Sequence, residues 1–130
     1  MKILVGYDGS NSAKDALALA KQHAAAFNAK VFVVASLMGG SATHATEVEH
    51  ANENLEFARS LLEEADVPCE AKLLVRGMSP GEDLIDFAKE QSVDEIIIGI
   101  KRRSKVGKLL FGSNAQYVIV KAPCPVVTVK

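Results

Sequence analysis

The sequence has few cysteines, almost no net charge and no long apolar run. Its 130 residues include two cysteines, Cys69 and Cys124, which lie far apart, match no metal-ligand spacing and indicate a reducing compartment. The formal net charge of −1 argues against a general nucleic-acid binder. No window reaches the roughly 20 apolar residues of a membrane-spanning helix, and the N-terminal stretch lacks the features of a signal peptide. We therefore expect a cytoplasmic protein that binds neither nucleic acid nor membrane.

Several catalytic and phosphate-binding motifs are also missing. The sequence has no G-x-S-x-G turn for a nucleophilic serine, and its spacing supports no Cys-His pair. A Walker A loop around Gly107-Lys108 would need Gly at position 102 and Ser or Thr at position 109, where the chain has Arg102 and Leu109. No G-x-G-x-x-G follows the first predicted strand. These absences predict that the protein is not a dedicated enzyme.

What is present is an alternation of apolar runs and amphipathic segments. The alternation predicts a single α/β domain over residues 1–130, with a parallel sheet covered by helices on both faces. The patterns Ser79-x-x-Glu82 and Ser113-x-x-Gln116 predict capping boxes at two helix starts, and Asn28 predicts a helix end. Apolar runs predict strands at 2–7, 31–37, 94–99 and 126–129, and a polar–apolar alternation predicts a half-exposed edge strand at 70–75. Apolar stripes predict helices at 10–27, 47–65, 79–90 and from 113 onward.

The loops that follow the first and fourth strands are the candidate binding region, because ligands of open parallel sheets bind at the carboxyl ends of strands. Asp8 opens the first loop. At Gly99, the start of the second, a missing side chain lets a ligand approach the backbone. Five of the 15 Lys and Arg residues follow it, and then Gly112-Ser113 precedes a helix whose N-terminus favours an anion. The segment suits a phosphate chain, although an ordinary turn with a solvated basic loop is the alternative.

The first predicted strand runs into Asp8 and a small-residue turn, and the last predicted strand is preceded by Pro125. Together with Gly99 and Gly112-Ser113, these features resemble the universal stress protein family, and the resemblance covers the whole chain. Gly99, position 102 and Gly112-Ser113 fall in the register of the motif G-x2-G-x9-G-[ST], which the ATP-binding branch carries after the fourth strand. The closing segment Pro125-Val126-Val127-Thr128-Val129 matches the family's Pro-Val-x-x-Val strand. The resemblance implies an open, Rossmann-like sheet of the adenine nucleotide alpha hydrolase type, with five parallel strands in the order 3-2-1-4-5.

The resemblance also implies a ligand and a site. The ligand is ATP with Mg²⁺ or Mn²⁺, the metal being held through the phosphates, and hydrolysis is weak at most. The protein is expected to be a stress-response or signalling homodimer that pairs through Val126, Val127, Thr128 and Val129 and acts on a downstream protein partner. The implied nucleotide contacts are Tyr7, Asp8, Ser36, Ile98, Gly99, Lys101, Arg102, Arg103, Gly112, Ser113 and Asn114.

Arg102 departs from the motif, which has glycine at this position. One interpretation is that Arg102 closes the pocket, so that the chain is an interaction module of the same fold that binds no nucleotide. In the other, its guanidinium pairs with the phosphates in a bidentate manner. We predict retained nucleotide binding, because both ends of the phosphate cradle are present.

A lesser candidate is a group of three residues, His44, Glu47 and His50, whose spacing places them on one helical face. Histidine and glutamate side chains in this arrangement can bind a metal. The alternative is a solvated helix start, and we predict no metal site formed by protein ligands.

Overall fold

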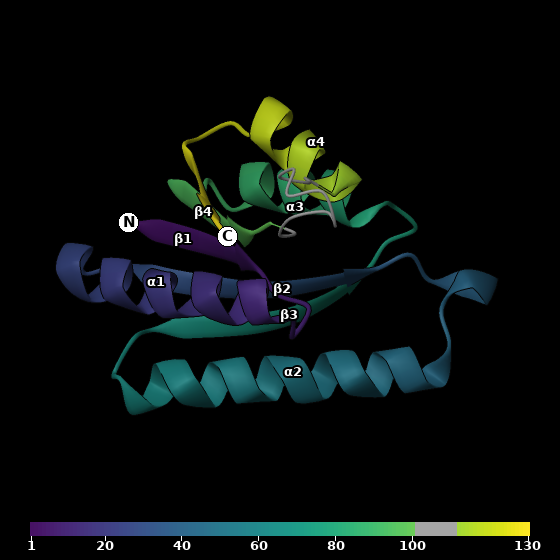
Figure 1. Cartoon of the computed structure of the whole chain (residues 1–130), viewed down its shortest axis with the longest axis horizontal. Coiled ribbons are helices and arrows are strands. Elements are labelled where there is room, and N and C mark those ends of the chain that lie inside the picture. Colours follow the sequence, from purple (N-terminus) through teal and green to yellow (C-terminus); the bar gives the residue numbers. More distant parts are fainter. Residues whose placement is uncertain (101–111) are drawn as a thin grey trace, which may run out of the picture.

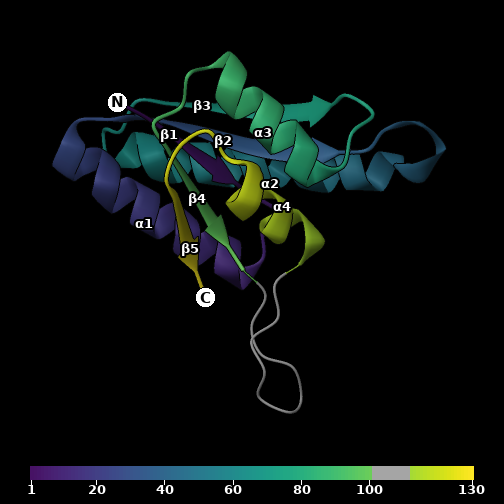
Figure 2. The ribbon, with the colours of Figure 1, turned by 90° about the horizontal axis from the view of Figure 1, so that it is seen from above.

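The computed structural model describes residues 1–100 and 112–130. They form an α/β fold in which a five-stranded sheet separates two layers of helices (Figures 1 and 2). None of the helices in these two ranges is long and apolar enough to span a membrane. The elements in chain order are β1 (Lys2–Gly6), α1 (Asn11–Phe27), β2 (Lys30–Leu37), the short 3-10 helix η1 (Gly40–Ala42), α2 (Ala45–Glu64), β3 (Cys69–Val75), α3 (Pro80–Glu90), β4 (Glu95–Gly99), α4 (Ser113–Lys121) and β5 (Val126–Val129).

The strand order is β3-β2-β1-β4-β5, and all neighbouring strands are parallel. This confirms the predicted fold class and order. β1 lies at the centre, where Ile3, Leu4 and Val5 are fully buried. The chain leaves β1 toward β2 on one side and later enters β4 on the other, so the strand order reverses between β1 and β4 (Figure 2). Ligand sites of open parallel sheets lie at this kind of switch point.

Each face of the sheet has its own apolar core. Because side chains alternate along a strand, Ile3 and Val5 pack in the core with α1 and α2, whereas Leu4 packs in the core with α3 and α4. Figure 1 shows α1 and α2 on one side of the sheet and α3 and α4 on the other. β3 alternates between half-buried and exposed residues at one edge, as its polar–apolar pattern predicts.

The predicted limits of α1 are confirmed. The Ser10 hydroxyl caps the helix by accepting the backbone N–H of Ala13 at 3.2 Å. Asn28 ends it with a φ of 53°, in the left-handed region that Asn tolerates. α2 starts at Ala45, two residues before the predicted start, because His44 and Glu47 form a capping box there.

The two predicted capping boxes are wrong in detail. The Ser79 hydroxyl donates to the Glu82 carboxylate at 2.8 Å and does not cap the backbone of α3. In α4 the N-cap is Gly112, with an extended backbone at φ −65° and ψ 155°, so Ser113 is already the first helical residue. Between β2 and α2 the chain forms the single turn η1.

Candidate functional site

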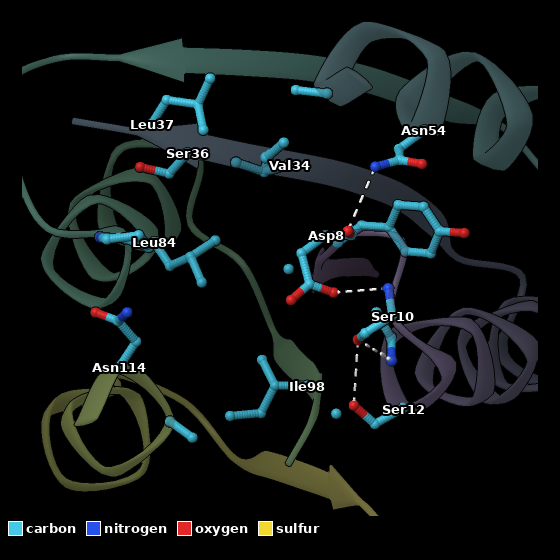
Figure 3. Close-up of a pocket in the computed structure, with 18 of the residues that line it drawn as sticks. Asp8, Ser10, Ser12, Val34, Ser36, Leu37, Asn54, Leu84, Ile98 and Asn114 are labelled. Atoms are coloured by element: carbon cyan, nitrogen blue, oxygen red, sulfur yellow. Dashed lines mark hydrogen bonds between the residues drawn. The ribbon is translucent and has the colours of Figure 1, made fainter. Parts of the chain in front are cut away.

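A cavity of about 500 Å³ lies at the carboxyl ends of β1, β2 and β4, beside the switch point (Figure 3). Its middle is apolar, with Val34, Leu84 and Ile98 on the walls. Polar groups stand on two sides of this apolar part. Asp8, Ser10 and Ser12 come from the β1–α1 turn and the first turn of α1, and Asn114 comes from the first turn of α4. A flat apolar ring with polar substituents fits this arrangement.

The β1–α1 turn is stabilised by one hydrogen bond within the turn and by another from α2. The Asp8 carboxylate accepts the backbone N–H of Ser10 at 2.9 Å, and the Asn54 amide donates to the Asp8 carbonyl oxygen at 3.3 Å. Gly9 adopts a φ of 79°, which side chains other than glycine rarely allow. The turn therefore holds the Asp8 side chain at the cavity (Figure 3).

Tyr7 contributes a ring to the cavity wall and is almost completely buried. Burial raises the pKa of its hydroxyl above the ordinary value of 10.0, and the negative charge of Asp8 raises the pKa further. The phenol is therefore neutral at physiological pH, and Tyr7 offers the ligand an apolar face and an uncharged hydroxyl.

Gly99 lines the cavity, but the space beside it is filled by α1. A Cβ atom at this position would lie 2.5 Å from the carbonyl oxygen of Ser12 and 2.8 Å from the amide nitrogen of Ala13. The missing side chain therefore allows the backbone of α1 to approach β4. The sequence interpretation was that the missing side chain admits a ligand, so the structure gives this glycine a packing role as well.

Asn114 joins the starts of α3 and α4. Its side-chain oxygen accepts the backbone N–H of Gly81 at 2.9 Å. This N–H belongs to the first turn of α3 and has no acceptor within its own helix. The same side chain lines the cavity, where its NH₂ group is the remaining donor (Figure 3).

Ser36 lies at the end of β2 and is bonded to a buried ion pair. Its hydroxyl donates to the Asp83 carboxylate at 2.6 Å, and Asp83 is fully buried on α3. Arg76 donates from Nε to the other oxygen of Asp83 at 2.6 Å and also pairs with Glu90 at 2.8 Å. Burial alone would lower the pKa of the Arg76 guanidinium, but the hydrogen bonds and charges of Asp83 and Glu90 hold it above its ordinary value. Arg76 is thus a permanent cation beside Asp83.

The predicted nucleotide contacts fall into three groups. Gly112 and Ser113 stand at the start of α4 and do not line the cavity as the described residues form it. Lys101, Arg102 and Arg103 lie outside the described residues. The predicted residues that line the cavity are Tyr7, Asp8, Ser36, Ile98, Gly99 and Asn114.

α2 and α3, from which no nucleotide contact was predicted, also contribute to the cavity. Glu47, His50 and Asn54 of α2 line the cavity, as do Pro80 and Leu84 of α3. The signal for the first group was their spacing of three and four along α2, beside the apolar stripe of that helix. Pro80 and Leu84 start the helix that follows β3.

The structure places the three residues of the lesser candidate, His44, Glu47 and His50, at the start of α2. His44 is the N-cap of α2, and Glu47 forms the capping box with it. His50 lines the cavity one turn later. Within residues 1–100 and 112–130, no group of three or more His, Cys, Asp or Glu side chains is placed to hold a metal ion.

Comparisons with known proteins find relatives along the whole length of the chain. A model of the universal stress protein family matches residues 1–130. A universal stress protein of Thermus aquaticus is 36% identical, over 98% of this chain and 97% of its own. The structure of a universal stress protein from Archaeoglobus fulgidus is similar with a TM-score of 0.93 and 41% identity, covering 100% of this chain and 98% of the other.

A second structure from Archaeoglobus fulgidus is a universal stress protein in complex with dAMP. It matches with a TM-score of 0.87 and 37% identity, over 100% of this chain and 98% of its own. Proteins of this family are generally stress proteins without enzymatic activity. The family model matches the whole chain, and the sequence relative and both solved structures are universal stress proteins. We conclude that the chain belongs to the universal stress protein family.

Proposed function

We propose that the protein binds an adenine nucleotide in the cavity at the switch point and acts as a stress-response or signalling protein. The observation that carries this proposal is the form of the cavity, in which an apolar slot between Val34, Leu84 and Ile98 has polar groups on two sides. The slot suits the faces of a purine, and we propose that Asp8 and Asn114, which line the cavity, contact the sugar and a phosphate. The dAMP complex of the relative from Archaeoglobus fulgidus supports the same ligand class.

The specific ligand that we propose is ATP with Mg²⁺ or Mn²⁺. A volume of about 500 Å³ is typical of small-molecule sites. The N-terminus of α4, at Gly112 and Ser113, provides backbone donors and a positive dipole end for the phosphates. In the sequence, Lys101, Arg102 and Arg103 add positive charge to the same proposed site. The phosphates would hold the metal, since the described residues offer no cluster of ligands for it.

We also propose that the single domain 1–130 forms a homodimer in the cytoplasm and acts on a protein partner. β5 pairs with β4 alone among the described strands, so its outer edge can pair with a second β5. Val126, Val127 and Val129 are only half-buried and Thr128 is exposed. The helix that precedes β5 in the chain, α4, has two exposed apolar side chains, Ile119 and Val120, which could add to an interface. Membership of the universal stress protein family supports the cytoplasmic location.

Calorimetric titration of Mg-ATP and of AMP into nucleotide-free protein tests the proposed ligand. We expect both nucleotides to bind with a dissociation constant of about 1–100 μM. An Arg102→Gly variant, which restores the motif glycine, tests the alternative interpretation of this position. If the natural protein bound neither nucleotide and the variant bound both, Arg102 would close the pocket and the chain would be an interaction module. If neither protein bound either nucleotide, the proposed function would be wrong.

Replacing Asn114 by Asp should separate anion binding from helix packing. Asp keeps an acceptor for the Gly81 N–H, and its negative charge is favourable near the N-terminus of α3. We therefore expect the free energy of unfolding to change by less than about 0.5 kcal/mol. The affinity for AMP should fall roughly tenfold, because the amide donor is replaced by a charge that repels the phosphate.

Asn114→Ala is the matched control for this prediction. It removes both the acceptor for Gly81 and the donor toward the cavity, so stability should fall by about 1 kcal/mol and AMP binding should weaken as well. Urea unfolding and calorimetric titration measure the two effects separately. Unchanged AMP affinity in Asn114→Asp would limit Asn114 to its role in packing.

A further inference from the structure

The hydroxyl of Ser36 has a fixed polarity. A serine hydroxyl has one hydrogen to donate and two lone pairs that accept. The hydrogen of Ser36 is directed to Oδ2 of Asp83, at an oxygen–oxygen distance of 2.6 Å. What this hydroxyl can still offer to a ligand is therefore an acceptor.

The partner that fixes this polarity is itself held in place. Asp83 is fully buried, and its second carboxylate oxygen accepts Nε of Arg76 at 2.6 Å. Arg76 also donates to the main-chain oxygen of Asp83 at 3.3 Å. A carboxylate next to a guanidinium cannot donate, so Asp83 cannot reverse its hydrogen bond with Ser36.

Ser36 stands in an apolar part of the cavity wall. It lies beside Val34 and Leu37 on β2, with Leu84 of α3 nearby, whereas Asp8 and Ser10 lie on the other side of the cavity (Figure 3). In the binding mode that we infer, a purine lies between these apolar side chains with the C6 edge of its ring at the end of β2. A polar group on that edge that finds no complementary partner would lose the hydrogen bonds that it makes in water.

We propose that the Arg76–Asp83 pair is a positioning device that holds Ser36 as an acceptor and thereby selects a 6-aminopurine over a 6-oxopurine. The inference rests on the proposed function and deepens it. The 6-amino group of adenine donates a hydrogen bond to the Ser36 oxygen. The 6-oxo group of hypoxanthine or guanine has only lone pairs. It would face the lone pairs of the Ser36 oxygen, and no hydrogen would lie between the two oxygens to form a hydrogen bond. Ser36 is the residue that contacts the base, and Asp83 and Arg76 act through it.

AMP and IMP test this selection, because IMP carries the 6-oxo group and a hydrogen on N1 in place of the 6-amino group. We expect the natural protein to bind AMP at least roughly tenfold more tightly than IMP. Ser36→Ala removes the acceptor with little change in volume, so the ratio of the two affinities should fall several-fold. Any preference for AMP that arises from the hydrogen on N1 of IMP is unchanged in Ser36→Ala. The change in the affinity ratio therefore measures the contribution of Ser36 alone.

Asp83→Asn gives a sharper test, because it should reverse the polarity. Arg76 requires an acceptor, so the amide oxygen of the new side chain should occupy the Oδ1 position and its NH₂ group should face Ser36. The NH₂ group then donates to Ser36, whose own hydrogen turns to the cavity. In Asp83→Asn we expect the affinity for IMP, relative to that for AMP, to rise roughly tenfold. We expect no such rise in the double variant that also carries Ser36→Ala.

The outcomes separate this inference from the proposed function. If the natural protein bound AMP and IMP equally, the selection would be wrong and the proposed function would stand. If it bound neither, both would be wrong. If Asp83 had a purely structural role, Asp83→Asn would lower the affinities for AMP and for IMP by the same factor. This result would overturn the inference. Should Asp83→Asn fail to fold, an unchanged affinity ratio in Ser36→Ala has the same consequence.

Discussion

Gly99→Ala is expected to lower the free energy of unfolding by about 2–3 kcal/mol, a large part of the stability of a small domain. The added Cβ atom would stand 2.5 Å from the carbonyl oxygen of Ser12 and 2.8 Å from the nitrogen of Ala13. Both are backbone atoms in the first turn of α1, which cannot move aside as the end of a flexible side chain can. The helix has to shift away from β4, and the β1–α1 turn with Asp8 moves with it. Urea unfolding followed by circular dichroism measures the loss.

Gly112→Ala is the matched control, since both residues are glycines of the same motif. A Cβ atom at Gly112 meets nothing within 4 Å among the described residues, and its φ of −65° suits any residue. We expect a change below about 1 kcal/mol, because alanine is only a poorer N-cap than glycine. Equal losses in the two variants would mean that the close approach of α1 does not set the requirement for glycine at position 99. If Gly99→Ala also loses nucleotide binding, the comparison shows whether the displacement of α1 accounts for this loss.

The sequence predicted most of the architecture because the architecture depends on local patterns. β4 is an apolar run that ends at a glycine, and α1 has a stripe of small apolar residues between Ser10 and Asn28. Alternation of such segments leaves few topologies, since crossovers between parallel strands are right-handed. The order of the strands came from the family resemblance, and the structure confirms it.

The features that the sequence did not predict depend on contacts between distant residues. Ser36 and Asp83 are 47 positions apart, and their hydrogen bond arises only when α3 packs beside the end of β2. The space beside Gly99 is filled by a helix that starts 88 positions earlier, so the motif alone suggests a ligand there. The capping pattern at Ser113 failed for a local reason. Gly112 already adopts the extended backbone of an N-cap, and α4 begins one residue earlier than the pattern indicates.

Arg76→Ala is expected to destabilise the protein by about 3 kcal/mol or more. Asp83 is fully buried, and Arg76 is the cation that pairs with its carboxylate. Removing the guanidinium leaves a buried negative charge with the Ser36 hydroxyl as its remaining side-chain donor among the described contacts. Burying an uncompensated charge costs far more than losing an exposed ion pair. Urea unfolding at neutral pH measures the difference from the natural protein.

Glu90→Ala and a double variant show whether the buried charge is the cause. Glu90 pairs with the same guanidinium, but its side chain is half exposed, so its removal should cost less than about 1 kcal/mol. In Arg76→Ala with Asp83→Ala no buried charge is left. The double variant should therefore be more stable than the sum of the two single losses predicts, by about 1–3 kcal/mol. Strictly additive losses would indicate that Arg76 stabilises the turn between β3 and α3 through packing of its side chain, independently of its charge.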